Sequence, residues 1–94
     1  MALEEIAVLV VDDEKRMREF LLTELERKGF KVDEAQDGEE AVEKAQGTDY
    51  HIILLDLRMP RMTGLEALER IRGIHPSPEV IIVTGHGTID TAIE

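Results

Sequence analysis

The feature that most constrains the fold is a run of four large aliphatic residues that ends on a carboxylate. Residues 52–55 read Ile-Ile-Leu-Leu, Asp56 follows them directly, and Pro60 ends any continuing strand soon afterwards. An unbroken apolar run is typical of a central strand in a parallel sheet that helices cover on both faces. Ligands of such sheets bind outside the carboxyl ends of the strands. The sequence therefore predicts that Asp56 lies where chemistry takes place.

Two more apolar runs end on oxygen-bearing side chains. Residues 6–11 are followed by Asp12 and Asp13, and residues 80–83 are followed by Thr84. The carboxyl ends of parallel strands lie along one edge of a sheet, so we expect three carboxylates and one hydroxyl to converge there. A single acid at a strand end is usually solvated or caps a helix, as Asp12 or Asp13 could. Acids at the ends of two strands and a hydroxyl at a third together favour a functional cluster.

Helical patterns separate these strands. Three segments have capping residues or glycine stops at their ends: 14–28 before Gly29, a helix from the cap Asp37 to Gly47, and a helix from the capping box Thr63 and Glu66 to Gly73. Their apolar residues at helical spacing are Met17, Phe20, Leu21 and Leu25, then Ala41, Val42 and Ala45, then Leu65, Leu68 and Ile71, the last three facing inward.

The order of elements predicts the fold class. Residues 30–35 alternate loosely and indicate a more exposed strand, so strands and helices alternate along the whole chain. Such alternation is typical of an α/β domain with a parallel sheet, right-handed crossovers and helices on both faces. We expect a single domain over residues 1–94, ending in the first turns of a fourth helix.

Composition narrows the function classes. The 21 acidic and 11 basic residues give a net charge of −10, which argues against direct binding to nucleic acid or to an anionic membrane. The chain has no cysteine, which excludes disulfides and thiolate metal sites. Its apolar runs fall short of the roughly 20 residues that span a bilayer. We expect a cytoplasmic domain without a membrane partner.

The expected cluster has a definite chemistry. Adjacent carboxylates repel one another unless protons or a cation neutralise them, and hard oxygen ligands favour Mg²⁺ or Ca²⁺ over zinc. A carboxylate beside Mg²⁺ can attack phosphorus and form an aspartyl-phosphate. Thr84 and the glycine-flanked loop behind it would offer a hydroxyl and free N–H groups to the phosphoryl oxygens.

These residues, in this order, resemble the receiver domain of two-component response regulators. The shared features are the acid pair Asp12-Asp13, Asp56 with Met59-Pro60 and Gly64 behind it, and Thr84. The resemblance implies a flavodoxin-like fold with strand order 2-1-3-4-5. It also implies a phosphoryl group received from a phosphohistidine on a sensor histidine kinase, and a conformational switch, rather than an enzyme, that controls an attached effector domain.

The resemblance assigns a role to each residue. Asp56 would be the phosphoacceptor, and Asp13 and Asp56 would bind Mg²⁺ directly together with the backbone carbonyl of Arg58. Asp12 would hold a metal-bound water. Thr84 would be the switch hydroxyl, with the Gly85 N–H and the backbone of Arg58 beside it at the phosphoryl group. The run from Thr84 to Ile89 is most similar to receivers of AAA+ transcription activators or other DNA-binding regulators.

One departure from the family pattern leads to a further expectation. The family has a Lys at the end of a fifth strand, and this chain ends before that strand and before the effector domain. We expect a truncated receiver whose bare edge strand, residues 80–83, favours a homodimer or a domain-swapped oligomer.

The sequence is also compatible with two other functions. A Mg²⁺-dependent phosphatase could use the same aspartyl-phosphate chemistry, although such enzymes place two acids two residues apart after the first strand. A receiver-like module without phosphorylation could serve protein contacts alone, although Asp12, Asp13, Asp56 and Thr84 are all present.

Overall fold

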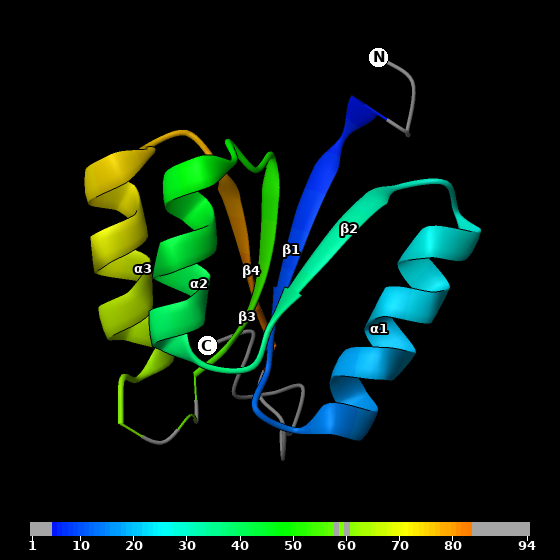
Figure 1. Ribbon diagram of the computed structural model, residues 1–94, viewed down its shortest axis with the longest axis horizontal. Coiled ribbons are helices and arrows are strands. Elements are labelled where there is room, and N and C mark those ends of the chain that lie inside the picture. The colour runs from blue at the N-terminus through cyan, green and yellow to red at the C-terminus, as the bar shows by residue number, and fades with distance from the viewer. Residues whose placement is uncertain (1–4, 58, 60, 84–94) are drawn as a thin grey trace.

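A computed structural model describes residues 5–57, 59 and 61–83 of the chain (Figure 1). Strands and helices alternate in the predicted order. The elements are β1 (Ala7–Val11), α1 (Lys15–Arg27), β2 (Lys31–Ala35), α2 (Gly38–Gly47), β3 (Ile52–Asp56), α3 (Gly64–Ile74) and β4 (Glu79–Val83). The expected fourth helix lies outside the described residues.

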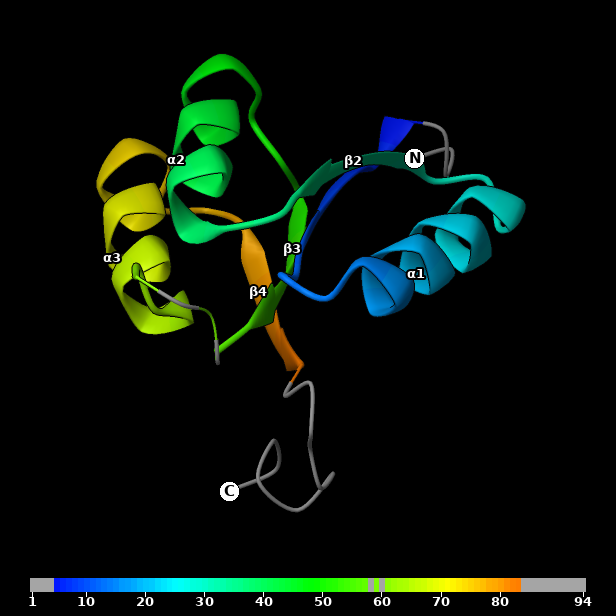
Figure 2. The same ribbon diagram turned by 60° about the horizontal axis from the view of Figure 1, so that its bottom comes forward.

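The described strands form one parallel sheet in the order β2-β1-β3-β4, which confirms the predicted topology. Helix α1 covers one face of the sheet, and α2 and α3 lie side by side on the other face (Figures 1 and 2). The two inner strands are β1 and β3, and Val11, the last residue of β1, pairs with Leu55, the residue before Asp56. This register places Asp12 and Asp56 at the same edge of the sheet.

The core lies mainly between the sheet and the pair α2 and α3. Strand β1 is buried from Val8 to Val11, as its unbroken apolar run predicts. Ala41, Ala45 and Ile71 reach this core from the two helices. Strand β2, at the edge, is more exposed, as the looser alternation in its sequence indicates.

Two apolar residues are more exposed than their helical spacing in the sequence indicates. Leu65 is 57% exposed, because the buried side chains of α3 are those of Ala67 and Ile71, and a residue two positions before Ala67 points to the opposite side of the helix. Phe20 is 60% exposed, because it lies beside the half-buried stripe of α1 instead of within it.

The predicted helix ends are nearly right. Asp37 and Thr63 cap α2 and α3, and Thr63 with Glu66 forms the full capping box. Gly29 follows α1 with a φ of 98°, a left-handed conformation that glycine adopts without strain. Helix α3 ends one residue later than expected, at Ile74. Among the described strands β4 forms one edge, and self-association through it stays a prediction.

Candidate functional site

Three carboxylates meet at the carboxyl edge of the sheet. Asp12 and Asp13 follow β1, and Asp56 is the last residue of β3. One oxygen from each of these carboxylates lies within 4.8 Å of the others. Asp12 and Asp56 are buried, with 1% and 2% of their surface exposed, whereas Asp13 is exposed to solvent. The predicted convergence of the three acids is confirmed.

The Asp12 side chain is oriented by the start of α1. Its Oδ1 accepts a hydrogen bond of 2.9 Å from the Glu14 N–H, and its own N–H donates to the Ala35 carbonyl at 3.1 Å. Its Oδ2 is buried and has no hydrogen-bond partner in the described part of the chain. A buried acceptor without a donor is costly, so this oxygen is suited to a ligand such as a cation.

Burial and mutual repulsion perturb these acids. Burial raises the pKa of Asp12, and the charges of Asp56, Asp13 and Glu14 raise it further, against the hydrogen bond from the Glu14 N–H. Burial also raises the pKa of Asp13, together with a side-chain hydrogen bond to Asp56 and the charge of Asp56. The folded chain therefore concentrates negative charge that a bound cation would relieve.

The loop after β3 is held close to Asp56 by Gly64. The Gly64 N–H donates to the Leu57 carbonyl at 3.3 Å. A Cβ atom at residue 64 would lie 2.8 Å from the Leu57 Cα and would overlap the Asp56 carbonyl oxygen. Only glycine allows the first turn of α3 to approach the end of β3 this closely.

The donor set fits a hard divalent cation. All three groups offer carboxylate oxygen, the ligand that Mg²⁺ and Ca²⁺ prefer, and one of those oxygens, Asp12 Oδ2, has no hydrogen-bond partner among the described residues. The predicted roles of Arg58, Thr84 and Gly85 fall on residues that lie outside the described part of the chain.

One contact of this site was not predicted from the sequence. Arg18, on α1, donates from Nη1 to the Asp12 carbonyl oxygen at 2.8 Å. The signal was an arginine on the helix face that also bears Met17, Leu21 and Leu25, where a charged residue needs a partner.

No helix in the described part of the chain is long and apolar enough to cross a membrane.

Comparison with known proteins agrees with this geometry. The chain matches the response regulator receiver domain family over residues 8–94. It is 43% identical over 83 residues to the transcriptional regulatory protein ResD of Bacillus subtilis, a match that covers 88% of this chain and 34% of ResD. The chain spans about a third of the length of the curated relatives it matches.

Solved structures share the fold. The response regulator TrrA of Thermotoga maritima, in complex with Mg²⁺-BeF, has a TM-score of 0.78 and 37% identity, covering 93% of this chain and 77% of TrrA. TrrA in complex with the histidine kinase ThkA has a TM-score of 0.79 and 37% identity, covering 88% of this chain and 72% of TrrA.

Proposed function

This chain belongs to the family of response regulator receiver domains, and we propose that it works as a phosphorylation switch with Asp56 as the phosphoacceptor. The phosphoryl group comes from a phosphohistidine on a sensor histidine kinase. The observation that carries this proposal is the cluster of Asp12, Asp13 and Asp56, in which a buried oxygen of Asp12 has no hydrogen-bond partner within the part of the chain that the structure describes.

Each acid has a distinct part. Asp56 ends β3 at a buried position, so the sheet fixes its carboxylate while water is largely kept away. Asp13, exposed at the mouth of the cluster, and Asp56 would ligate Mg²⁺ directly, and Asp12 would hold one of its waters. When bound, Mg²⁺ offsets the charge of the carboxylates and of the incoming phosphoryl oxygens.

The transfer is a substitution at phosphorus. An oxygen of Asp56 forms the new bond to phosphorus while the bond from phosphorus to the histidine nitrogen breaks. The kinase imidazole keeps the electron pair of that bond and takes up a proton. Hydrolysis of the aspartyl-phosphate later returns the free carboxylate of Asp56 and inorganic phosphate.

The remaining family roles are part of the proposal. The Arg58 carbonyl would complete the protein ligands of Mg²⁺, and the Thr84 hydroxyl and the Gly85 N–H would bind the phosphoryl oxygens. Movement of Thr84 toward the phosphoryl group would change the surface that the residues after β4 present to a partner. The chain is thus a switch that assists its own phosphorylation, and has no separate substrate to turn over.

The proposed partners follow from the relatives. A histidine kinase is bound to TrrA in one solved structure, and ResD is a transcriptional regulatory protein. We propose a histidine kinase partner for this chain, an effector domain that controls transcription, and a cytoplasmic location. Residues 1–94 would form one receiver domain of that larger protein.

Intact mass spectrometry tests the proposal. The chain is incubated with a small phosphodonor such as acetyl phosphate, with Mg²⁺ or with a chelator, beside Asp56→Asn. One added phosphoryl group, only on the parent and only with Mg²⁺, is the expected result. No label on a folded parent would contradict phosphoacceptor function and favour an interaction module. Release of phosphate from added phosphomonoesters would favour a phosphatase.

A further inference from the structure

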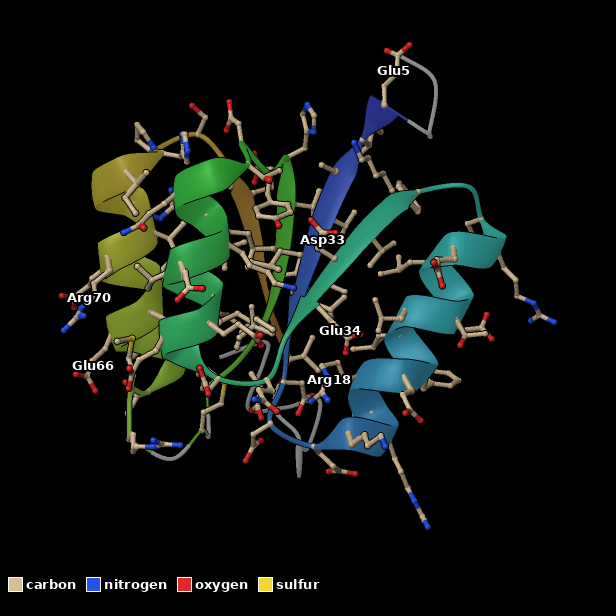
Figure 3. The ribbon with its side chains drawn as sticks, viewed as in Figure 1. Glu5, Arg18, Asp33, Glu34, Glu66 and Arg70 are labelled. Carbon is tan, nitrogen blue, oxygen red and sulfur yellow. The ribbon has the colours of Figure 1, made fainter. Side chains whose placement is uncertain are left out.

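Arg18 ties α1 to the ends of two strands. Its Nη1 donates to the Asp12 carbonyl oxygen at 2.8 Å, and its Nε donates to Glu34 Oε1 on β2 at 2.6 Å. The Arg18 side chain is only 12% exposed, whereas that of Glu34 is 48% exposed. Figure 3 shows the two side chains together between α1 and β2, at the carboxyl end of the strands.

The carbonyl that Arg18 binds belongs to the peptide group between Asp12 and Asp13. The Asp12 N–H is bound to Ala35 and its Oδ1 to Glu14. With Arg18 on the carbonyl, every polar group of Asp12 except Oδ2 has a hydrogen-bond partner among residues 5–57, 59 and 61–83. The hydrogen bond from Arg18 therefore fixes the orientation of the peptide plane that joins the Cα atoms of Asp12 and Asp13, and so the direction of both side chains.

Apolar packing alone does not supply this constraint. Helix α1 has no fully buried residue, in contrast to α2 and α3. The planar guanidinium makes two bonds in fixed directions, which a flexible ammonium cannot reproduce. The two bonds of Arg18 thus hold the first turns of α1 against the carboxyl ends of β1 and β2.

We propose that Arg18 is a positioning residue of the acidic cluster and sets its affinity for Mg²⁺ through the Asp12–Asp13 peptide group. This inference rests on the proposed function of the cluster as a Mg²⁺ site. Arg18 does not touch the cation; it holds the backbone that presents the ligands.

If Arg18 acts through its position, removing it should change Mg²⁺ binding in the opposite direction from that expected if it acts through its charge. Arg18 is cationic, so if it acted by charge alone, its removal would strengthen Mg²⁺ binding by removing a nearby positive charge. If it acts by position, its removal weakens binding, because the ligand-bearing peptide group can reorient. Groups that orient metal ligands are worth about tenfold or more in metal affinity.

The test is Mg²⁺ titration of the chain, followed by the amide chemical shifts of residues 13 and 56–57. The variants are Arg18→Met, which removes the charge and both bonds, and Arg18→Lys, which keeps the charge. Arg16→Met is the matched control, because Arg16 is an exposed arginine in the same part of α1. Circular dichroism and melting curves establish that each variant is folded at the titration temperature.

We expect Arg18→Met and Arg18→Lys to weaken Mg²⁺ binding by about tenfold, and Arg16→Met to leave it near the parent value. Equal or tighter binding in folded Arg18→Met would overturn the inference, as would full affinity in Arg18→Lys. A purely structural role would lower the melting temperature without changing the Mg²⁺ dissociation constant of the folded chain. Failure of the parent itself to bind Mg²⁺ would instead reject the proposed function.

If Arg18→Met does not fold, Arg18→Lys together with Glu34→Gln carries the test. Glu34→Gln removes the charge that holds the Arg18 Nε and leaves the Asp12 contact in place. We expect Glu34→Gln to weaken Mg²⁺ binding less than Arg18→Lys does, and the reverse order would contradict the inference.

Discussion

Gly64 packs directly against the carbonyl group of Asp56, so closely that a Cβ atom at residue 64 would overlap the carbonyl oxygen. The Gly64 N–H also donates to the next carbonyl along the chain, that of Leu57. The first turn of α3 and the end of β3 are therefore in backbone contact. This contact couples the position of α3 to the residue that we propose receives the phosphoryl group.

Replacing Gly64 with alanine should disturb the proposed phosphoacceptor from outside the acidic cluster. The new methyl group must push against backbone atoms, which cannot rotate away, so we expect a loss of about 1–3 kcal/mol in the free energy of unfolding. We also expect slower phosphorylation of Asp56, because its backbone is displaced. Urea unfolding and intact mass after timed exposure to a phosphodonor measure the two effects.

Gly73 is the matched control for that substitution. It lies in the same helix, and apart from its chain neighbours and the backbone of α3, no atom of the described residues lies within 4 Å of a Cβ atom placed there. Gly73→Ala should stabilise the chain by up to about 1 kcal/mol through helix propensity, with unchanged phosphorylation. Similar behaviour of the two alanine variants would show that the contact with Asp56 has no consequence.

Neutralising Asp13 should stabilise the chain in the absence of a cation. At neutral pH, Asp13 adds charge to a cluster that already holds Asp12 and Asp56. Two like charges about 4 Å apart in a water-like environment repel by about 1 kcal/mol. For a domain of this size, this predicts a melting temperature roughly 4–8 °C higher for Asp13→Asn. The measurement is thermal unfolding by circular dichroism with a chelator present.

The same variant should respond less to Mg²⁺. The parent should gain stability as Mg²⁺ is added, because the cation binds the folded state, and Asp13→Asn should gain far less. A parent and a variant that respond equally to Mg²⁺ would remove Asp13 from the metal site.

The raised pKa values of Asp12 and Asp13 predict how stability depends on pH. The folded chain binds protons at these acids more tightly than the unfolded chain, whose carboxyl pKa is near the ordinary 3.8. Their unfavourable contribution is therefore full above the raised pKa values and fades as pH falls toward 3.8. Unfolding free energies of the parent and of the double variant Asp12→Asn with Asp13→Asn should converge as pH falls, without Mg²⁺. A gap that widens on acidification would contradict this sign.

The buried hydroxyl of Tyr50 gives a separate prediction about the stability of the core. Its hydroxyl donates to Asp33 Oδ2 at 2.6 Å, and its ring is buried. Burial, the hydrogen bond to Asp33 and the charge of Asp33 raise the pKa of Tyr50 above its ordinary value near 10. A hydrogen bond to a charged group contributes about 1.5–3 kcal/mol, so Tyr50→Phe should lose that amount at neutral pH.

The raised pKa of Tyr50 also has a consequence in alkali. The parent should lose stability as pH rises above about 10, because the unfolded phenol ionises first. Tyr50→Phe should lack this part of the decline, which urea unfolding at neutral and alkaline pH measures. An identical alkaline decline in the variant would exclude Tyr50 as its source.

Much of the fold was predictable because the strongest sequence signals act locally. The unbroken apolar runs of β1 and β3 correctly indicated strands of a parallel sheet, and the register then brought Asp12 and Asp56 together. Strand β3 is less covered than predicted, because Ile52 and Leu54 on one of its faces are only half-buried. The capping box of Thr63 and Glu66 set the start of α3 within its own four residues. Local chemistry of this kind does not depend on the rest of the chain.

The features that the sequence did not predict depend on tertiary packing. Leu65 and Phe20 are apolar residues near the correct helical spacing, but neighbouring residues occupy the positions that face the sheet. The place of Arg18 on an apolar helix face indicated that it needs a partner, but the partner is a backbone carbonyl, that of Asp12, which residue types do not identify. The close approach of Gly64 to Asp56 likewise required the placement of α3.

The proposed switch depends on Asp56 being the residue that carries the phosphoryl group. After reaction with acetyl phosphate and Mg²⁺, borohydride reduces an aspartyl-phosphate to homoserine, which peptide mass spectrometry assigns to one position. We predict homoserine at position 56, and none in samples prepared with a chelator. Homoserine at position 12 or 13, or no homoserine in a folded chain that binds Mg²⁺, would contradict the assignment of Asp56 as the phosphoacceptor.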